Sequence, residues 1–167
     1  MALTFHQISI DELHTVLNLF KEAAEHIAKM NINHWQYWKN PPAEKLKWVQ
    51  DGILNNEFFF IKNPETLTIG MVRILNNDKL YWGEQTKPAL YVHSLVVKTE
   101  FNGSGLGKTI IKHIEGRAKQ ENINCLRLDA DAKNPKLCTY YEQLGFKHVG
   151  VVTLPLSTYN LYEKDIE

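Results

Sequence analysis

The stretch FNGSGLGKTII (residues 101–111) places three glycines at alternate positions directly before a segment with helical periodicity. Glycine adopts backbone conformations that other residues avoid, so consecutive N–H groups of such a turn can point inward toward an anion. The helix that follows adds the partial positive charge of its N-terminus. The stretch therefore predicts a pyrophosphate-binding turn that opens a helix over about 105–120. A tight strand-to-helix turn of purely structural purpose is the alternative.

The ATP-binding loop G-x-x-x-x-G-K-[ST] is a second alternative for this stretch. Gly107, Lys108 and Thr109 match its end, but Asn102 stands where its first glycine belongs. A nucleotide triphosphatase would also need a strand end that binds Mg²⁺. Asp129 is the candidate for that strand end, and Arg127 interrupts the apolar run before it. The sequence therefore disfavours a nucleotide triphosphatase.

Periodicity and turn signals on either side of this stretch predict a succession of strands and helices. Ser9 and Glu12 have the spacing of a capping box. Asn134 suits the N-cap of a last helix, and Gly145 suits its C′ stop. The predicted strands cover 4–9, 57–62, 67–75, 89–98, 123–130, 146–152 and 159–166, and the predicted helices cover 10–30, 43–54, 105–120 and 135–145. This order predicts an α+β fold, with a mixed sheet covered by helices, in a single domain over 1–167.

Charge and cysteine content limit the partners and the compartment. Lys plus Arg and Asp plus Glu number 19 each, so no global field attracts the chain to nucleic acid or to an anionic membrane. Cys125 and Cys138 form no C-x-x-C pair, and we expect both thiols to be reduced and structural. The N-terminal residues lack a signal-peptide pattern, and no apolar run is long enough to cross a bilayer. We therefore expect a cytoplasmic protein with no nucleic-acid or membrane partner.

Three features taken together resemble the acetyl-CoA-binding core of the GNAT superfamily of N-acyltransferases. They are the strand LYVHSLVV (90–97), the glycine turn at 102–107, and Asn134 seven residues before the Tyr of YEQLGF (141–146). Two positions depart from the family pattern, because Asn102 replaces a Gln or Arg and Leu137 stands where Ala is frequent. The resemblance implies a mixed, mostly antiparallel central sheet that is flanked by helices and splayed at the acetyl-CoA site.

The resemblance also implies how acetyl-CoA binds as the cosubstrate. Main-chain groups of the strand before the glycine turn would bond the pantetheine and polarise the thioester carbonyl, and the turn would hold the pyrophosphate. Asn134 would contact the cofactor from the last helix. The implied cofactor-binding residues are Leu95, Val96, Val97, Asn102, Gly103, Ser104, Gly105, Leu106, Gly107, Lys108 and Asn134. Core packing of the strand residues is compatible with this role.

Two side chains carry the implied chemistry. Tyr141 looks like the family's general acid for the CoA sulfur, with aromatic packing as the alternative. His93 is the candidate base, because an imidazole near neutral pKa can accept a proton from an ammonium directly or through water. Tyr91, His93 and Leu95 would share one face of a regular strand. A hydrogen-bonded structural histidine, or a relay made of water alone, remains open for His93.

The aromatic segment HWQYW (34–38) lies where family members build the acceptor pocket. Trp35, Tyr37 and Trp38 are therefore candidates for substrate contact, with core packing at helix ends as the alternative. Tyr91 is a further candidate for substrate contact. The metal-binding motif H-E-x-x-H does not occur in the sequence. His26 and His34 are eight residues apart, a spacing that gives no strong indication of a metal site, so we assign no metal.

The sequence thus predicts an N-acetyltransferase that transfers the acetyl group of acetyl-CoA directly to a primary amine. The acceptor would be a small molecule or a peptide, and a homodimer is compatible with the pattern. A non-catalytic acyl-CoA-binding or regulatory module on the same fold is the alternative.

Overall fold

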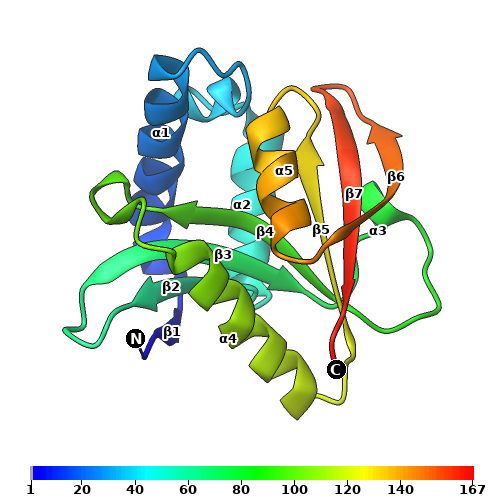
Figure 1. The fold of residues 1–167 in the computed structure, drawn as a ribbon. Coiled ribbons are helices and arrows are strands. Elements are labelled where there is room, and N and C mark those ends of the chain that lie inside the picture. Colours follow the sequence, from blue (N-terminus) through cyan, green and yellow to red (C-terminus); the bar gives the residue numbers. More distant parts are fainter. Residues whose placement is uncertain (1) are drawn as a thin grey trace. The chain divides into compact units, whose positions relative to one another are not determined.

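The computed structural model describes residues 2–167. Seven strands are hydrogen-bonded in the order β1-β2-β3-β4-β5-β7-β6 (Figure 1). β4 and β5 run parallel, whereas β1–β2, β2–β3, β5–β7 and β6–β7 are antiparallel. The strands are β1 Thr4–Gln7, β2 Phe58–Lys62, β3 Thr68–Leu75, β4 Leu90–Val97, β5 Cys125–Asp131, β6 Lys147–Thr153 and β7 Thr158–Asp165. The predicted class, a mixed and mostly antiparallel sheet flanked by helices, is confirmed.

The helices also follow the prediction closely. They are α1 Leu13–Lys29, α2 Ala43–Leu54, α3 Lys79–Trp82, α4 Leu106–Gln120 and α5 Pro135–Gln143, with short 3₁₀ turns at Ile10–Glu12, Gln36–Lys39 and Thr99–Phe101. The one-turn helix α3 was not predicted, because four residues are too few to show a period. None of the helices in residues 2–167 has the length and apolar character needed to cross a membrane.

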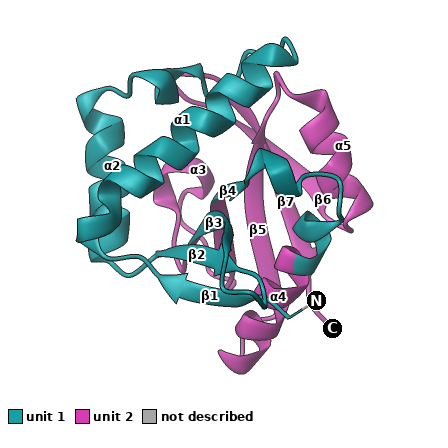
Figure 2. Cartoon of the chain, turned by 90° about the vertical axis from the view of Figure 1, so that its left-hand side faces the viewer, with its two compact units in different colours: residues 1–73, 94–109 teal, residues 74–93, 110–167 magenta. Residues whose placement is uncertain are grey.

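The chain contains two compact units that interleave in the sequence (Figure 2). Unit 1 consists of Met1–Arg73 and Ser94–Thr109, and unit 2 consists of Ile74–His93 and Ile110–Glu167. Each unit is described by itself below. The expectation of a single domain over 1–167 stays a prediction.

The core of unit 1 is built from the apolar faces of α1 and α2 and the inner side chains of β2 and β3. Glu12 accepts a hydrogen bond from the Ser9 backbone N–H at 3.0 Å, as the capping-box spacing predicted. On α1, Phe20 is completely buried, and its ring stacks on Trp38 with centroids 3.9 Å apart. Burial of a large aromatic pair of this kind is a major source of stability for a small core.

A close backbone approach within unit 1 depends on Gly70 in β3. A Cβ atom built at this position would lie 2.1 Å from the carbonyl oxygen of Val96 in β4. Further along, the Lys98 N–H donates to the Ile69 carbonyl at 2.8 Å. The absence of a side chain at residue 70 therefore sets how closely β3 approaches the end of β4.

Unit 2 is organised around β5, which pairs with β7 along its whole length. β4 pairs with β5 at Leu90–Val92, opposite Leu126–Leu128. Arg127 is buried beside this pairing, and it donates to Glu163 at 2.8 Å and to the Tyr91 hydroxyl at 2.7 Å. The Tyr91 ring also packs against Trp82. Substrate contact by Tyr91 stays a prediction.

Ser94 lies inside β4 and has a φ of +53°. A left-handed residue inside a strand is typical of a β-bulge, which shifts the alternation of side chains between the two faces. This irregularity was not predicted, because serine carries no strong signal for a positive φ. The expected shared face of Tyr91, His93 and Leu95 stays a prediction.

Candidate active site

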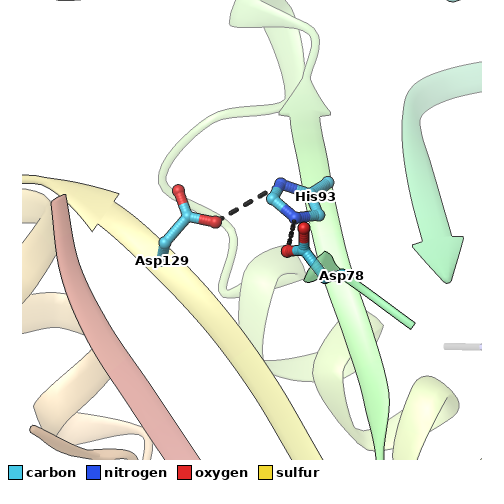
Figure 3. A group of neighbouring side chains, drawn as sticks. All are labelled: Asp78, His93 and Asp129. Carbon is cyan, nitrogen blue, oxygen red and sulfur yellow. Dashed lines mark hydrogen bonds and ion pairs between the residues drawn. The ribbon is translucent and has the colours of Figure 1, made fainter. Parts of the chain in front are cut away.

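His93, Asp78 and Asp129 form a buried cluster within unit 2 (Figure 3). His93 lies on β4, Asp78 directly precedes α3, and Asp129 lies on β5. The Nε2 atom of His93 is 2.5 Å from Oδ2 of Asp78, and its Nδ1 atom is 3.4 Å from Oδ2 of Asp129. The three side chains are 9%, 7% and 10% exposed, respectively. We name these residues the acid–histidine–acid cluster.

The short helix α3 explains how Asp78 is held in place. Its Oδ1 atom accepts a hydrogen bond from the Tyr81 backbone N–H at 3.4 Å, so Asp78 is the N-cap of α3. Its other oxygen faces His93. The Tyr81 ring in turn lies 5.0 Å from the His93 ring, centroid to centroid. One turn of helix therefore presents both a carboxylate and an aromatic ring to the imidazole.

The two distances assign different roles to the two ring nitrogens. The 2.5 Å contact is a short hydrogen bond, which places a proton on Nε2 facing Asp78. The 3.4 Å separation exceeds the usual hydrogen-bond range, so Nδ1 faces Asp129 at ion-pair distance. This assignment of the proton follows from the partners. In the neutral imidazole Nδ1 is then the nitrogen that accepts a proton, and the imidazolium formed would lie between two carboxylates.

The same geometry bears on metal binding. Asp78 and Asp129 approach different nitrogens of one ring, as Figure 3 shows, whereas a single metal ion binds only one of those nitrogens. The three side chains nevertheless each offer one ligand atom within 4.8 Å of the others, a spacing that is compatible with a metal ion. The absence of a metal stays a prediction.

Tyr141 lies on α5 in the same unit and is 8% exposed. Its ring packs against Phe146 at 5.9 Å and Tyr162 at 6.5 Å between centroids. Burial raises the pKa of the Tyr141 phenol well above its ordinary value, and the negative charge of Asp129 raises it further. The phenol is therefore protonated at all physiological pH values and can act as a hydrogen-bond donor.

The ends of α5 match the predicted signals. Asn134 Oδ1 accepts from the Leu137 N–H at 3.2 Å, Pro135 occupies the first helical position, and Gly145 has a φ of +95°. The N-cap and the C′ stop are confirmed. This cap gives Asn134 a structural purpose, and its contact with a cofactor stays a prediction.

The glycine turn lies in unit 1. Gly103 and Gly105 have φ values of +81° and +72°, and the Ser104 hydroxyl donates to the Phe101 carbonyl at 2.7 Å. Gly107 does not share the left-handed conformation expected of all three glycines, because it already belongs to α4. Two glycines thus shape the turn, and the helix begins at Leu106.

Comparison with known proteins identifies the family. The model of the acetyltransferase (GNAT) family matches residues 16–146, which is most of the chain. The chain belongs to the GNAT acetyltransferase family. Membership makes it an acetyl-CoA-dependent N-acyltransferase, in agreement with the resemblance found in the sequence. The uncharacterized N-acetyltransferase YesJ of Bacillus subtilis is 24% identical over 161 residues, covering 93% of this chain and 86% of YesJ.

Solved structures of GNAT acetyltransferases share the fold. A GNAT acetyltransferase from Listeria monocytogenes superposes with a TM-score of 0.78 at 18% identity, covering 98% of this chain and 95% of that one. The aminoglycoside acetyltransferase AAC(6′)-Ib, in complex with coenzyme A and kanamycin, gives a TM-score of 0.72 at 19% identity with the same coverage. GNAT neighbours therefore bind coenzyme A on this fold.

In this GNAT chain the aromatic segment 34–38 contributes to the core of unit 1. Trp38 is buried in its stack with Phe20, and Trp35 meets the edge of the same Phe20 ring at 5.7 Å. Tyr37 lies 4.9 Å from the Lys45 ammonium. These contacts fit the packing alternative left open for the segment, and Trp38 is only 3% exposed. Substrate contact by Trp35, Tyr37 and Trp38 stays a prediction.

Neither cysteine has the properties of an acyl carrier. Both thiols are free and buried, as expected of structural cysteines. Burial raises the pKa of the Cys125 thiol to about 11. A thiol that remains protonated at neutral pH is a poor nucleophile, which favours direct transfer over a covalent enzyme intermediate.

Sequence analysis found His93 and Tyr141 but missed Asp78 and Asp129 as their neighbours. Asp129 was considered only as a Mg²⁺ ligand of the disfavoured nucleotide triphosphatase. Asp78 lies in the turn-like segment NND (76–78), where an aspartate is expected for local reasons. No signal in the sequence connects either carboxylate to His93.

Proposed function

We propose that this GNAT enzyme transfers the acetyl group of acetyl-CoA directly to a primary amine, with His93 as the base and Tyr141 as the donor to the CoA sulfur. The observation that carries this proposal is the orientation of His93, whose Nε2 contacts Asp78 at 2.5 Å while its Nδ1 faces Asp129 at 3.4 Å. A histidine oriented by a carboxylate in this way is suited to general-base catalysis.

The role of Tyr141 follows from the direction of its pKa shift. Because burial raises the pKa of the phenol, complete proton transfer to a thiolate would be unfavourable. A hydrogen bond from the neutral phenol still stabilises the charge that builds up on sulfur as the C–S bond breaks. Tyr141 is therefore proposed as a preorganised donor, which is a refinement of the general acid implied by the family resemblance.

Acetyl-CoA binding is proposed for the residues that match the family motif. Gly103 and Gly105 have the left-handed φ values that let main-chain N–H groups face an anion, and α4 begins directly behind them. These local features support the glycine turn as the pyrophosphate site. The full proposed set is Leu95, Val96, Val97, Asn102, Gly103, Ser104, Gly105, Leu106, Gly107, Lys108 and Asn134.

The acceptor is proposed to be a small-molecule or peptide amine. Structural neighbours include an aminoglycoside acetyltransferase bound to kanamycin and a spermidine N-acetyltransferase chimera, both of which act on amines by name. We place the enzyme in the cytoplasm, since two buried thiols without a disulfide suit a reducing compartment.

The test combines binding with turnover. Calorimetry with acetyl-CoA should show association with the purified chain, and a pooled amine screen should release free CoA thiol. Binding without thiol release from any amine would support the non-catalytic acyl-CoA-binding module instead. No heat of association with acetyl-CoA would remove both functions.

A further inference from the structure

We propose that Asp129 receives the ammonium group of an aliphatic acceptor amine and passes its proton to Nδ1 of His93, with Asp78 as the positioning residue. This inference rests on the proposed acetyl transfer. It adds two residues that the family motif does not include, and it specifies the chemical class of the acceptor.

The position of Asp129 within the cluster is the first support. Its buried Oδ2 atom faces His93 Nδ1 at 3.4 Å, the nitrogen that Asp78 leaves available for a proton. The separation is slightly longer than a hydrogen bond, as is common for catalytic contacts before substrate is bound. A proton placed on Asp129 would have Nδ1 as its acceptor after a small adjustment of either side chain.

Two phenols that lie near Asp129 cannot take a proton from it. Burial raises the phenol pKa values of Tyr141 on α5 and Tyr159 on β7, and the negative charge of Asp129 raises both further. The pKa of Tyr159 is raised to about 12. Asp131 also acts on Tyr159. Phenols that are already protonated cannot take a proton, so among these groups His93 is the base.

Charge favours an ammonium over a neutral acceptor. With neutral His93, Asp78 and Asp129 bring two negative charges into a buried cluster, where electrostatic attraction is stronger than in water. An aliphatic amine has a pKa near that of lysine, about 10.4, and therefore arrives as a cation. An arylamine is neutral at pH 7 and gains nothing from this attraction. The cluster thus selects for alkylamines.

The proton balance is closed. The ammonium gives one proton to Asp129, and Asp129 passes it to Nδ1 of His93, which becomes an imidazolium between two carboxylates. The amine lone pair then forms the C–N bond to the thioester carbonyl carbon, and the C–S bond breaks. The second proton of the attacking nitrogen ends on the departing thiolate, whose charge Tyr141 stabilises. His93 finally releases its proton to water.

The first experiment measures cation binding and needs no turnover. Protein with ¹⁵N-labelled histidine is titrated with 2-phenylethylammonium and with its neutral analogue 2-phenylethanol, and the ring ¹⁵N signals of His93 are followed. The ammonium should shift these signals in the wild type and not in Asp129→Asn, and the alcohol should shift them in neither. Equal shifts by both compounds, or an unchanged response in the variant, would overturn the proposal.

The second experiment measures kcat/KM against pH for alkylamine acceptors found in the screen. Asp129→Asn should lower kcat/KM at pH 7 by about 100-fold or more, the usual scale of general-base catalysis. The loss should shrink as the pH approaches the pKa of the amine, because more amine then arrives unprotonated. A loss that is equal at every pH would indicate a merely structural role.

Control variants separate the possible failures. Asp165→Asn removes an exposed carboxylate of the same unit, which pairs with Lys87 at 2.6 Å, and should leave the pH profile unchanged. Asp78→Asn should change the protonated nitrogen of His93, as seen in its ¹⁵N shifts, while acetyl-CoA binding and folding are retained. If amines are acetylated but Asp129→Asn behaves like wild type, this inference fails and the proposed function stands. If the ammonium binds through Asp129 but no amine is ever acetylated, the proposed function fails instead.

Discussion

Replacement of Tyr141 by Phe tests the proposed donor to the CoA sulfur. The ring packs against Phe146 and Tyr162 in a site that is almost closed to water, and Phe preserves that packing. The change therefore removes one hydroxyl and little else, and the free energy of unfolding should change by no more than about 1 kcal/mol.

The expected kinetic effect is large because the lost donor is buried. Removal of one preorganised hydrogen-bond donor from a water-excluded site typically lowers kcat about 10²- to 10³-fold, equivalent to about 3–4 kcal/mol. The KM for acetyl-CoA should change little, because the bond is made to charge that develops only in the transition state. The assay is thiol release at saturating acetyl-CoA with an amine from the screen.

Tyr140 offers a matched control for this substitution. It is the adjacent residue on α5, and it is 37% exposed where Tyr141 is 8% exposed. Tyr140→Phe keeps the ring that lies 5.8 Å from the Tyr141 ring, and it should retain kcat within about twofold because it removes only a more exposed hydroxyl. If Tyr141→Phe also retained kcat, the donor role would be refuted. Because burial raises the pKa of Tyr141, the phenol should stay protonated between about pH 8 and 10. Deprotonation of Tyr141 should therefore not lower the wild-type kcat in this pH range.

Three further predictions concern stability, thiol reactivity and the last helix. Gly70→Ala should lower the free energy of unfolding by about 1–3 kcal/mol, because its Cβ would lie 2.1 Å from the Val96 carbonyl. At Gly116 on α4, nothing lies within 4 Å of a new Cβ atom. Gly116→Ala should therefore raise the free energy of unfolding, measured in urea, by about 0.5–1 kcal/mol. At pH 8 the raised pKa of Cys125 should make alkylation of this thiol about 100-fold slower in folded than in unfolded protein. The alkylation rate of the folded protein should rise as the pH approaches 11. Equal alkylation rates in the folded and unfolded states would contradict the burial of Cys125. Asn134→Ala should lower the free energy of unfolding by about 1 kcal/mol, because the N-cap hydrogen bond of α5 is lost. Asn134→Ser should restore that stability, because serine is also a good N-cap residue. A loss of acetyl-CoA affinity in both Asn134 variants would indicate direct cofactor contact, whereas retained affinity in both would leave the cap as the whole role.

Much of the fold follows from local sequence signals. The bounds of α2 were predicted to the residue, and β2, β3 and β4 within one residue at each end, because apolar periodicity and capping residues act within one turn or strand. Ser9 with Glu12, and Asn134 with Gly145, are local signals of the same kind. The glycine turn was recognised as well, although only Gly103 and Gly105 adopt the positive φ that three glycines suggested.

Other features could not be predicted, because local preference gives no information about them. The sequence does not show that Trp38 stacks on Phe20, which lies on α1. It also does not show that the Tyr91 hydroxyl accepts a hydrogen bond from Arg127. The helix α3 and the irregularity at Ser94 are short features that depend on the chain packed around them.

The sequence by itself determined the α+β class, the bounds of α2, β2, β3 and β4 to within one residue, the family motif and the identity of the candidate base and sulfur donor. Only the tertiary structure decided that His93 lies between two carboxylates, since Asp78 is fifteen residues before it and Asp129 lies on another strand. Pairing of β4 with β5 brings His93 and Asp129 together in unit 2, and the N-cap of α3 adds Asp78. Burial strengthens the electrostatic forces among the three side chains. Neither effect is encoded in the spacing of residues along the chain.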